Sequence, residues 1–255
     1  MLLSVLIPCF NERKTIGIVL DRVARVDLSP LKMAIEIIYV DDGSTDGSPD
    51  EVAAYRRAHP EAPIKALTLP ANRGKGYAIR MGLAEAEGDF VIIQDADLEY
   101  FPEDWPKLLR PLVDGEAVAV YGSRKLGPSG PYPGRALFDV ALAIENAVIK
   151  FCYDFAVSDT ATCYKAIQTD LLRSLNLHSN GFEFCPEVTC KLLSRGVAIR
   201  EEPIRYLPRG RRDGKKIKAR HLFEALFEIA RCRIRFGRIP IVAGRVADAA
   251  TEGLG

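Results

Sequence analysis

Three acidic residues, Asp95, Asp97 and Glu99, follow directly on a short apolar run at residues 90–93. A run of this length and composition predicts a buried strand. If that strand belongs to an open parallel sheet, its carboxyl end lies where such sheets bind ligands, and three carboxylates there need a cation to offset their repulsion. Carboxylate oxygens suit Mg²⁺ or Mn²⁺, which also accept phosphate oxygens as ligands. The alternative is a solvated acidic turn, and the surrounding sequence decides between the two.

The elements that must position these acids precede them in a regular alternation. Strands are predicted at residues 2–8, 35–40 and 64–69, and helices at 14–26, from 48 onward, and at 77–86. This alternation is typical of a parallel sheet with helices on both faces. The right-handed crossover rule then places all four strand ends at one edge of the sheet. We therefore expect residues 8–12, 40–44, 73–76 and 95–99 to gather there.

The second half of the chain is less regular. We predict helices at 102–113, 135–155, 185–195 and 219–236, strands at 117–121, 160–167 and 197–202, and a turn-rich break at 127–134. The chain is interpreted as one domain over residues 1–238, with halves at 1–122 and 123–238, and a weakly ordered tail at 239–255. The helix at 135–155 is amphipathic, and its apolar face either packs in the core or lies on a membrane interface.

Composition excludes several classes of function. Thirty-five basic and thirty-four acidic residues leave a formal net charge of +1, which gives no global basis for binding nucleic acid. No window approaches the roughly 20 apolar residues that span a bilayer. The six cysteines form no Cys-x-x-Cys pair, so we expect a reduced, cytoplasmic protein. The fingerprints of dinucleotide-binding and P-loop proteins are also missing.

Taken together in this order, the four strand-end segments resemble the family 2 inverting glycosyltransferases of the GT-A type. Within that family the chain is most similar to the dolichyl-phosphate mannose and glucose synthases, from about residue 3 to 236. The resemblance implies an α/β GT-A (Rossmann-like) fold of three α/β/α layers around a mostly parallel sheet, with a nucleotide-sugar-binding first half and an acceptor-binding second half. It also implies transfer of a hexose from GDP-mannose or UDP-glucose to a polyprenyl phosphate, with Mg²⁺ or Mn²⁺ as cofactor.

The resemblance carries over to individual residues. It implies that the metal is held by Asp95, Asp97 and Glu99, and that Asp97, Arg124 and Arg209 are catalytic. The acceptor phosphate would be approached by Ser123, Arg124, Arg209 and Lys215. The nucleotide sugar would be held by Pro8, Phe10, Asn11, Glu12, Asp41, Asp42, Lys75, Asp95 and Ala96. A membrane-bound acceptor would require either peripheral contact at the cytoplasmic membrane face, through the helices at 135–155 and 219–236, or a membrane-protein partner.

Two departures from the synthases leave the acceptor open. Residues 159–165 replace a Ser-Gly-Phe sequence, and Glu183 stands where several synthases have a basic or neutral residue. Glu183 is either a helix-capping or core-edge acid, or a general base for a hydroxyl acceptor. The second role would make the protein a soluble transferase acting on a small molecule or glycan. A sugar-nucleotide pyrophosphorylase lacks support because its glycine-rich basic loop is missing. A non-catalytic nucleotide-sugar-binding protein is disfavoured because Asp95 and Asp97 are both present.

Overall fold

The fold is built on one seven-stranded sheet, seen in a computed structural model that describes residues 1–128, 135–209, 220–237 and 239. The strand order is β3-β2-β1-β4-β6-β5-β7. Only β6 runs antiparallel to its two neighbours, β4 and β5, and the other pairs are parallel. The strands are β1 (Leu2–Cys9), β2 (Ala34–Asp41), β3 (Ile64–Thr68), β4 (Phe90–Ile93), β5 (Ala119–Ser123), β6 (Lys165–Gln168) and β7 (Arg200–Pro203).

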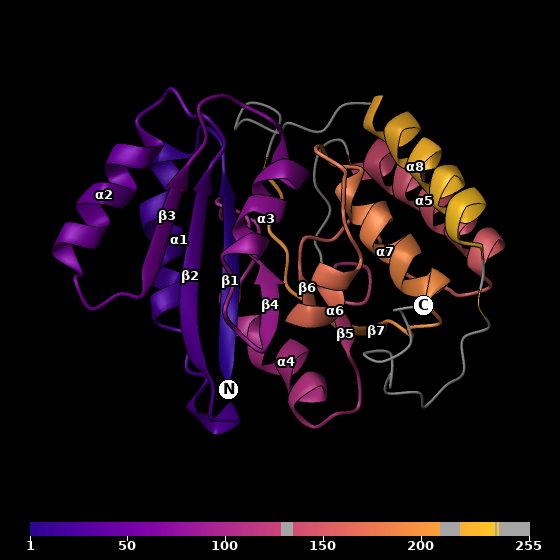
Figure 1. Ribbon diagram of the computed structural model, residues 1–255, viewed down its shortest axis with the longest axis horizontal. Helices are drawn as coiled ribbons and strands as arrows, with labels where there is room; N and C mark the ends of the chain where they lie inside the picture. Colours follow the sequence, from indigo (N-terminus) through magenta and orange to yellow (C-terminus); the bar gives the residue numbers. More distant parts are fainter. Residues whose placement is uncertain (129–134, 210–219, 238, 240–255) are drawn as a thin grey trace, which may run out of the picture.

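Helices cover both faces of this sheet (Figure 1). They are α1 (Arg13–Ala24), α2 (Ser48–Ala58), α3 (Lys75–Ala84), α4 (Trp105–Val113), α5 (Arg135–Tyr153), α6 (Thr169–Ser174), α7 (Phe184–Ser194) and α8 (Arg220–Phe236), with 3₁₀ turns at Ser29–Leu31 and Pro102–Asp104. Successive side chains of a strand point to opposite faces. In β1, accordingly, Val5 belongs to the core cluster that includes residues of α1, α2 and α4, while Leu6 belongs to the cluster that includes residues of α3, α6, α7 and α8. The predicted three-layer GT-A architecture is confirmed.

Several predicted elements differ from the structure at their boundaries by one or more residues, and two of these differences have a clear physical reason. The predicted strand at 160–167 is β6, which begins only at Lys165, because the buried Lys165 Nζ donates to the carbonyls of Thr160 (2.7 Å) and Thr162 (2.8 Å) and holds that segment as a loop. The predicted helix at 77–86 is α3, which begins two residues earlier, directly after Gly74 with its φ of 100°. The sequence pattern does not specify the antiparallel direction of β6, because so short a strand carries little register information.

α5 and α8 lie side by side and form the end of the molecule opposite α2 (Figure 1). Each presents large apolar side chains to solvent at helical spacing: Val140, Ile144 and Phe151 on α5, and Phe223, Phe227 and Ile234 on α8. Among the described residues, no helix is both long and apolar enough to cross a membrane. Apart from Ile239, the predicted tail at 239–255 lies outside the described residues.

Candidate functional site

Carboxylates from two strand ends meet at the carboxyl edge of the sheet. Asp97 and Glu99 follow β4, and Glu12 precedes α1 in the loop after the neighbouring strand β1. Asp97 and Glu99 are buried, and the Glu99 backbone N–H donates to Asp97 Oδ1 at 3.0 Å. The sequence predicted this convergence, because parallel strands bring their carboxyl ends to one edge.

Arg209 lies between these carboxylates. Its Nη1 is 2.9 Å from Glu12 Oε2, and its Nη2 is 2.7 Å from Asp97 Oδ2. Its backbone N–H donates to Glu99 Oε1 at 2.7 Å, so that the main chain and the side chain of Arg209 both bind this acidic edge. Three neighbouring acids raise the pKa of Arg209 beyond its usual range despite its burial. One guanidinium thus supplies part of the positive charge that the three acids require.

Asp95 binds a different cation. Its carboxylate pairs with Lys75 at the start of α3, and Lys75 Nζ also lies 2.7 Å from the buried Cys163 Sγ. The Lys75 ammonium holds the pKa of Asp95 below its usual value against the opposing effect of burial. Sequence reasoning named Lys75 but missed Cys163, because no local pattern marks a lone cysteine 88 residues away as a neighbour.

The protonation of Asp97 reflects this crowding. Burial, followed by the charges of Asp95 and Glu99, raises the pKa of Asp97 to about 7. Arg209 opposes that shift without cancelling it. A carboxylate in this state gains from any further positive charge that comes close to it.

The acidic edge fits a hard divalent cation by the chemistry of its donors. The group offers carboxylate oxygens only, and burial together with the charges of Asp95 and Glu99 raises the pKa of Asp97. Within the described part of the chain, however, the oxygens of Asp95, Asp97 and Glu99 do not form a group that lies entirely within 4.8 Å. Two basic side chains, Arg209 and Lys75, hold the acids apart. A cation bound here would share or replace these two partners.

The acids after β2 support the surrounding loops. Asp42 accepts hydrogen bonds from the backbone N–H groups of Arg73 (2.7 Å) and Gly74 (2.8 Å), and Asp41 accepts one from Ser44 N–H (3.0 Å). Both carboxylates are buried. Asp42 therefore fixes the turn that leads into α3 and its Lys75. Their predicted contact with the nucleoside stays a prediction.

The remaining residues predicted to hold the nucleotide sugar line the same edge. Asn11, with a φ of 54°, accepts from Thr45 N–H at 2.8 Å and joins the loops after β1 and β2. Pro8 and Phe10 flank the end of β1 and are partly exposed, whereas Ala96 is buried. The carbonyl of Ala96 accepts a hydrogen bond from Thr15 at 2.8 Å, which ties the acidic loop to α1.

Arg124 is bound to an acid that sequence reasoning missed. Its Nε and Nη2 lie 2.7 and 2.6 Å from the two carboxylate oxygens of Asp159, and both residues are buried. Ser123 is also buried and lies 2.7 Å from the hydroxyl of Ser158. The contact predicted between the acceptor phosphate and these two residues stays a prediction. Lys215 lies outside the described residues.

Glu183 caps the loop before α7. Its Oε1 accepts hydrogen bonds from the N–H groups of Asn180 (3.1 Å) and Gly181 (2.9 Å). The same loop packs tightly against α3, where Tyr77 N–H donates to the Asn180 carbonyl at 3.0 Å. Glu183 thus holds a segment that borders Lys75. Glu183 is the residue that precedes α7, but its carboxylate makes no capping hydrogen bond to that helix, so the helix-capping interpretation is wrong and the general-base role stays a prediction.

Comparison with known proteins finds glycosyltransferases. A family profile described as Glycosyl transferase family 2 matches residues 4–175. A dolichol-phosphate mannosyltransferase of Pyrococcus furiosus is 26% identical over 235 residues, which cover 91% of this chain and 63% of the relative. A low-salt glycan biosynthesis hexosyltransferase of Haloferax volcanii is 30% identical over 208 residues, covering 81% of this chain and 48% of the relative. The chain therefore spans between about half and two thirds of these two relatives' lengths.

Solved structures with a similar fold include those of glucosyl-3-phosphoglycerate synthase of Mycobacterium tuberculosis. Its complex with phosphoglyceric acid superposes with a TM-score of 0.63 at 25% identity, covering 90% of this chain and 79% of the synthase. Its complex with Mn²⁺, uridine diphosphate and glucosyl-3-phosphoglycerate gives a TM-score of 0.60 at 23% identity, covering 93% and 80%.

Proposed function

The chain belongs to glycosyl transferase family 2, and from that premise we propose that it transfers a hexose, with inversion, from a GDP- or UDP-sugar to a polyprenyl phosphate. The observation that carries this proposal is the convergence of Glu12, Asp97 and Glu99 on Arg209 at the carboxyl edge of the sheet. A nucleoside diphosphate sugar brings its negative charge to this edge, and the acids there can receive it only together with cations. The arrangement is therefore suited to a donor that arrives with a divalent metal.

Asp95, Asp97 and Glu99 are the residues that would hold Mg²⁺ or Mn²⁺. When bound, the metal supplies Lewis-acid stabilisation to the leaving diphosphate. Around it, the fixed loops carry Asp41, Asp42 and Lys75, which orient the donor along the edge. Backbone N–H groups hold Asp41 and Asp42, and Asp95 and Cys163 hold Lys75, before the donor binds. Little of the binding energy is therefore spent on ordering these groups.

An anionic acceptor needs orientation more than deprotonation. A phosphate acceptor is already ionised at neutral pH, so guanidinium groups that fork onto its oxygens are the appropriate partners. Arg209 qualifies, because a metal that takes over its carboxylates would leave its guanidinium available to the acceptor. We place Arg124 beside it in the same role, with Asp159 fixing its orientation at 2.6 and 2.7 Å.

The surface supports an acceptor that is carried in a membrane. α5 and α8 expose apolar side chains, with Phe151 at 89%, Phe223 at 73% and Phe227 at 71% exposure. Exposed aromatic stripes on neighbouring amphipathic helices suit burial in the interface of a bilayer. The dolichol-phosphate mannosyltransferase relative adds to this support through the acceptor in its name.

A second candidate is transfer to a hydroxyl of a small soluble acceptor, with Glu183 as general base. It is favoured by the position of Glu183 on the loop that contacts α3 next to Lys75. The structural likeness to glucosyl-3-phosphoglycerate synthase, whose named product is a glucosylated phosphoglycerate, points the same way.

A transfer assay separates the candidates. Purified protein with Mg²⁺ or Mn²⁺ is given a panel of GDP- and UDP-hexoses, with polyprenyl phosphate supplied or withheld, and nucleotide release is measured. We expect release to depend on the lipid phosphate and to fall about 100-fold or more in Asp97→Asn, as for loss of a group that stabilises transition-state charge. Asp114→Asn, an exposed acid at the end of α4, serves as the matched control and should retain full activity.

Release that is independent of the lipid, together with transfer to phosphoglycerate or another hydroxyl acceptor, would contradict the lipid-phosphate proposal. In that case Glu183→Gln should abolish transfer while leaving donor binding intact. Unchanged turnover in Glu183→Gln would eliminate the general-base role.

A further inference from the structure

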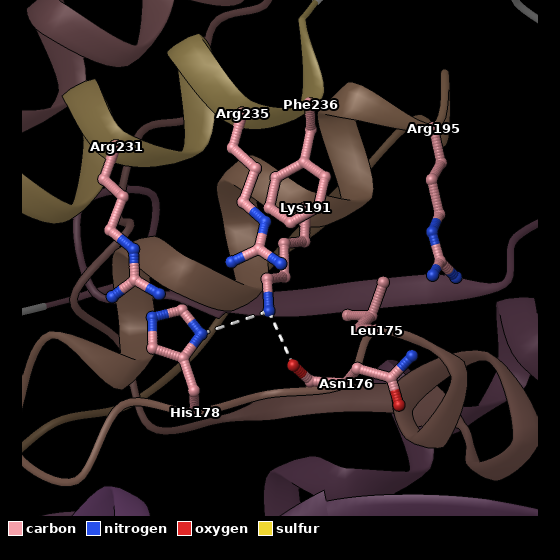
Figure 2. A pocket seen from close by; sticks show the side chains of 8 residues that line it. All are labelled: Leu175, Asn176, His178, Lys191, Arg195, Arg231, Arg235 and Phe236. Carbon is pink, nitrogen blue, oxygen red and sulfur yellow. Dashed lines mark hydrogen bonds between the residues drawn. The ribbon is translucent and has the colours of Figure 1, made fainter.

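A cavity away from the acidic edge has a strongly basic wall. It has a volume of about 340 Å³ and lies where the last turns of α7 and α8 meet the loop after α6 (Figure 2). Its polar lining is almost entirely basic, contributed by His178, Lys191, Arg195, Arg231 and Arg235. None of these residues contributes to the site described above.

The basic side chains form two facing rows. Lys191 and Arg195 are four residues apart on or just after α7, and Arg231 and Arg235 are four residues apart on α8. Residues at this spacing lie on one face of a helix, and like charges there destabilise it. Figure 2 shows Arg231 and Arg235 reaching from α8 toward His178 and Lys191. The repulsion within and between the rows has to be offset by other groups.

Two buried acids offset part of this charge. Glu187 Oε1 lies 2.6 Å from Lys191 Nζ, and Glu228 Oε2 lies 3.6 Å from Arg231 Nη1. His178 sits between them, with Nδ1 2.5 Å from Glu187 and Nε2 3.2 Å from Glu228. Glu187 also accepts the backbone N–H groups of His178 and Ser179, at 2.9 Å each. The positive charges of Lys191 and Arg231 are therefore each paired with a carboxylate.

Arg195 and Arg235 have no carboxylate partner among the described residues. Arg195 donates to the Oγ and the carbonyl of Ser174, both at 2.5 Å, and Arg235 stacks over the ring of Phe236 at 5.5 Å. Counting these four cations against Glu187 and Glu228 leaves an excess of two positive charges around one cavity, before any protonation of His178. The cavity is thus suited to an anion.

A divalent cation is a poorer occupant. The possible ligand atoms of His178, Glu187 and Glu228 do lie within 4.8 Å of one another. However, the Lys191 ammonium already contacts Glu187 at 2.6 Å and lies 3.4 Å from His178 Nδ1. A metal would have to displace that buried ammonium and approach two arginines, which like-charge repulsion disfavours.

We propose that this cavity binds the phosphate group of a ligand, at a site separate from the donor site. Guanidinium groups bind phosphate oxygens through parallel N–H···O bonds. No carboxylate among the described residues competes with a phosphate for Arg195 or Arg235. The phosphate belongs either to a small soluble ester or to a lipid headgroup, since Ile234 beside Arg235 is 86% exposed on the apolar stripe of α8. The proposal stands whatever the transferred sugar or its acceptor.

The test compares two variants that remove the same charge. In Arg231→Gln/Arg235→Gln the α8 row is neutralised, and in Arg56→Gln/Arg57→Gln two exposed arginines of α2 are neutralised instead. Inorganic phosphate is titrated into each protein by calorimetry. Sedimentation with phosphatidylcholine vesicles, with and without phosphatidic acid, probes the headgroup source. Arg195→Gln is a second pocket variant in case the double variant folds poorly.

We expect wild type and the α2 variant to bind phosphate alike, and both pocket variants to bind it about tenfold or more weakly, which corresponds to about 1.4 kcal/mol. Loss seen with inorganic phosphate supports a soluble ester, and loss seen only with phosphatidic acid vesicles supports a lipid headgroup. Equal binding by all four proteins would overturn the proposal. So would a rise in Tm with Zn²⁺ that is lost in His178→Gln while phosphate has no effect.

Discussion

The guanidinium of Arg209 offsets part of the repulsion among the carboxylates of Glu12, Asp97 and Glu99. Three carboxylates lie within ion-pairing reach of its guanidinium, the nearest at 2.7 Å, and its side chain is only 20% exposed. In this setting the charges are weakly screened by water, so removing the one cation leaves uncompensated like charges. A divalent cation and Arg209 are alternative solutions to the same electrostatic problem, and a cation bound with a donor would shift the balance between them.

Arg209→Ala should lower the free energy of unfolding by about 2 kcal/mol, between the values typical of exposed and of buried ion pairs. Mg²⁺ or Mn²⁺ should restore part of that loss in the variant, because the freed carboxylates become available to the metal. Urea unfolding near neutral pH, with and without metal, measures both effects. Arg110→Gln removes a half-exposed arginine that is 3.9 Å from its acid and should change stability little. A variant as stable as wild type without metal would contradict this account.

Glu145 on α5 is a buried acid without a full set of partners. Its side chain is buried, and its Oε1 accepts no hydrogen bond from the described residues. Burial raises the pKa of Glu145 from 4.5 to about 7, although Lys165 and Arg124 oppose the shift. The folded state therefore holds a proton that the unfolded chain releases between about pH 4.5 and 7.

The raised pKa of Glu145 makes stability fall as pH rises through that window. The contribution is present below pH 4.5 and is lost above the folded pKa of about 7. A tenfold change in proton affinity corresponds to about 1.4 kcal/mol, so the full loss is at most about 3 kcal/mol. Glu145→Gln cannot titrate, so relative to wild type it should gain stability as pH rises from acidic to alkaline values. Urea denaturation at several pH values tests this, with the exposed Glu85→Gln as control. A pH-independent difference would refute the assigned pKa.

At the scale of elements, the start of α3 is fixed by close approach between backbones. Gly74 has a φ of 100° and a ψ of 157°, a region that only glycine occupies without strain. A Cβ placed on Gly74 would lie 2.4 Å from the Asn180 carbonyl oxygen, so the α6–α7 loop leaves no room for a side chain. This contact sets the position of Lys75 relative to Asp95.

Gly74→Ala should therefore destabilise the protein more than a glycine substitution that costs backbone strain alone. Gly115 also has a positive φ, 73°, but a Cβ there would meet nothing within 4 Å. We expect a loss of about 1 kcal/mol for Gly115→Ala and at least twice that for Gly74→Ala. Donor binding should weaken only in Gly74→Ala, since α3 carries Lys75. Equal losses of stability in the two variants would show that the α6–α7 loop moves away from the new Cβ at little cost in free energy.

At the scale of the whole molecule, the apolar stripes and the acidic edge belong to different parts of one sheet-centred body. α5 and α8 form one end of the long axis, while the acidic edge is built where β1 and β4 end near the middle of the sheet (Figure 1). A bilayer that contacts α5 and α8 would bind the protein at one end of its long axis. The phosphate of a long-chain lipid in that bilayer would then have to extend to the acidic edge near the middle of the sheet. The exposed stripes give this orientation a physical basis.

Phe223→Ser/Phe227→Ser should weaken association with vesicles that contain polyprenyl phosphate by about tenfold or more, because burying each phenylalanine contributes about 1.5–3 kcal/mol. Both residues are more than 70% exposed, so stability in solution should change by less than about 0.5 kcal/mol. Sedimentation with vesicles measures the first effect and urea unfolding the second. Ile18→Ser, an exposed apolar residue of α1, is the control. Vesicle binding equal to wild type would argue against this orientation.

The sequence by itself determined the layered architecture and the acidic edge. Both depend on short-range information: apolar periodicity predicts strands and helices, and the parallel alternation of the first half sends every strand end to one edge. Asp95, Asp97, Glu99, Glu12 and Lys75 could be grouped in this way without any knowledge of packing. The family resemblance, which rests on the same motifs, agrees with the profile match over residues 4–175.

Only the tertiary structure decided which charges meet. Arg209 binds Asp97, which is 112 residues away in the sequence, and Glu12, which is 197 residues away. Asp159 likewise pairs with Arg124. The antiparallel insertion of β6 between β4 and β5, and the basic cavity between α7 and α8, likewise have no local signature. Such pairs are selected by how segments distant in sequence pack against each other. Spacing along the chain carries no information about that packing once the regular alternation of strands and helices has ended.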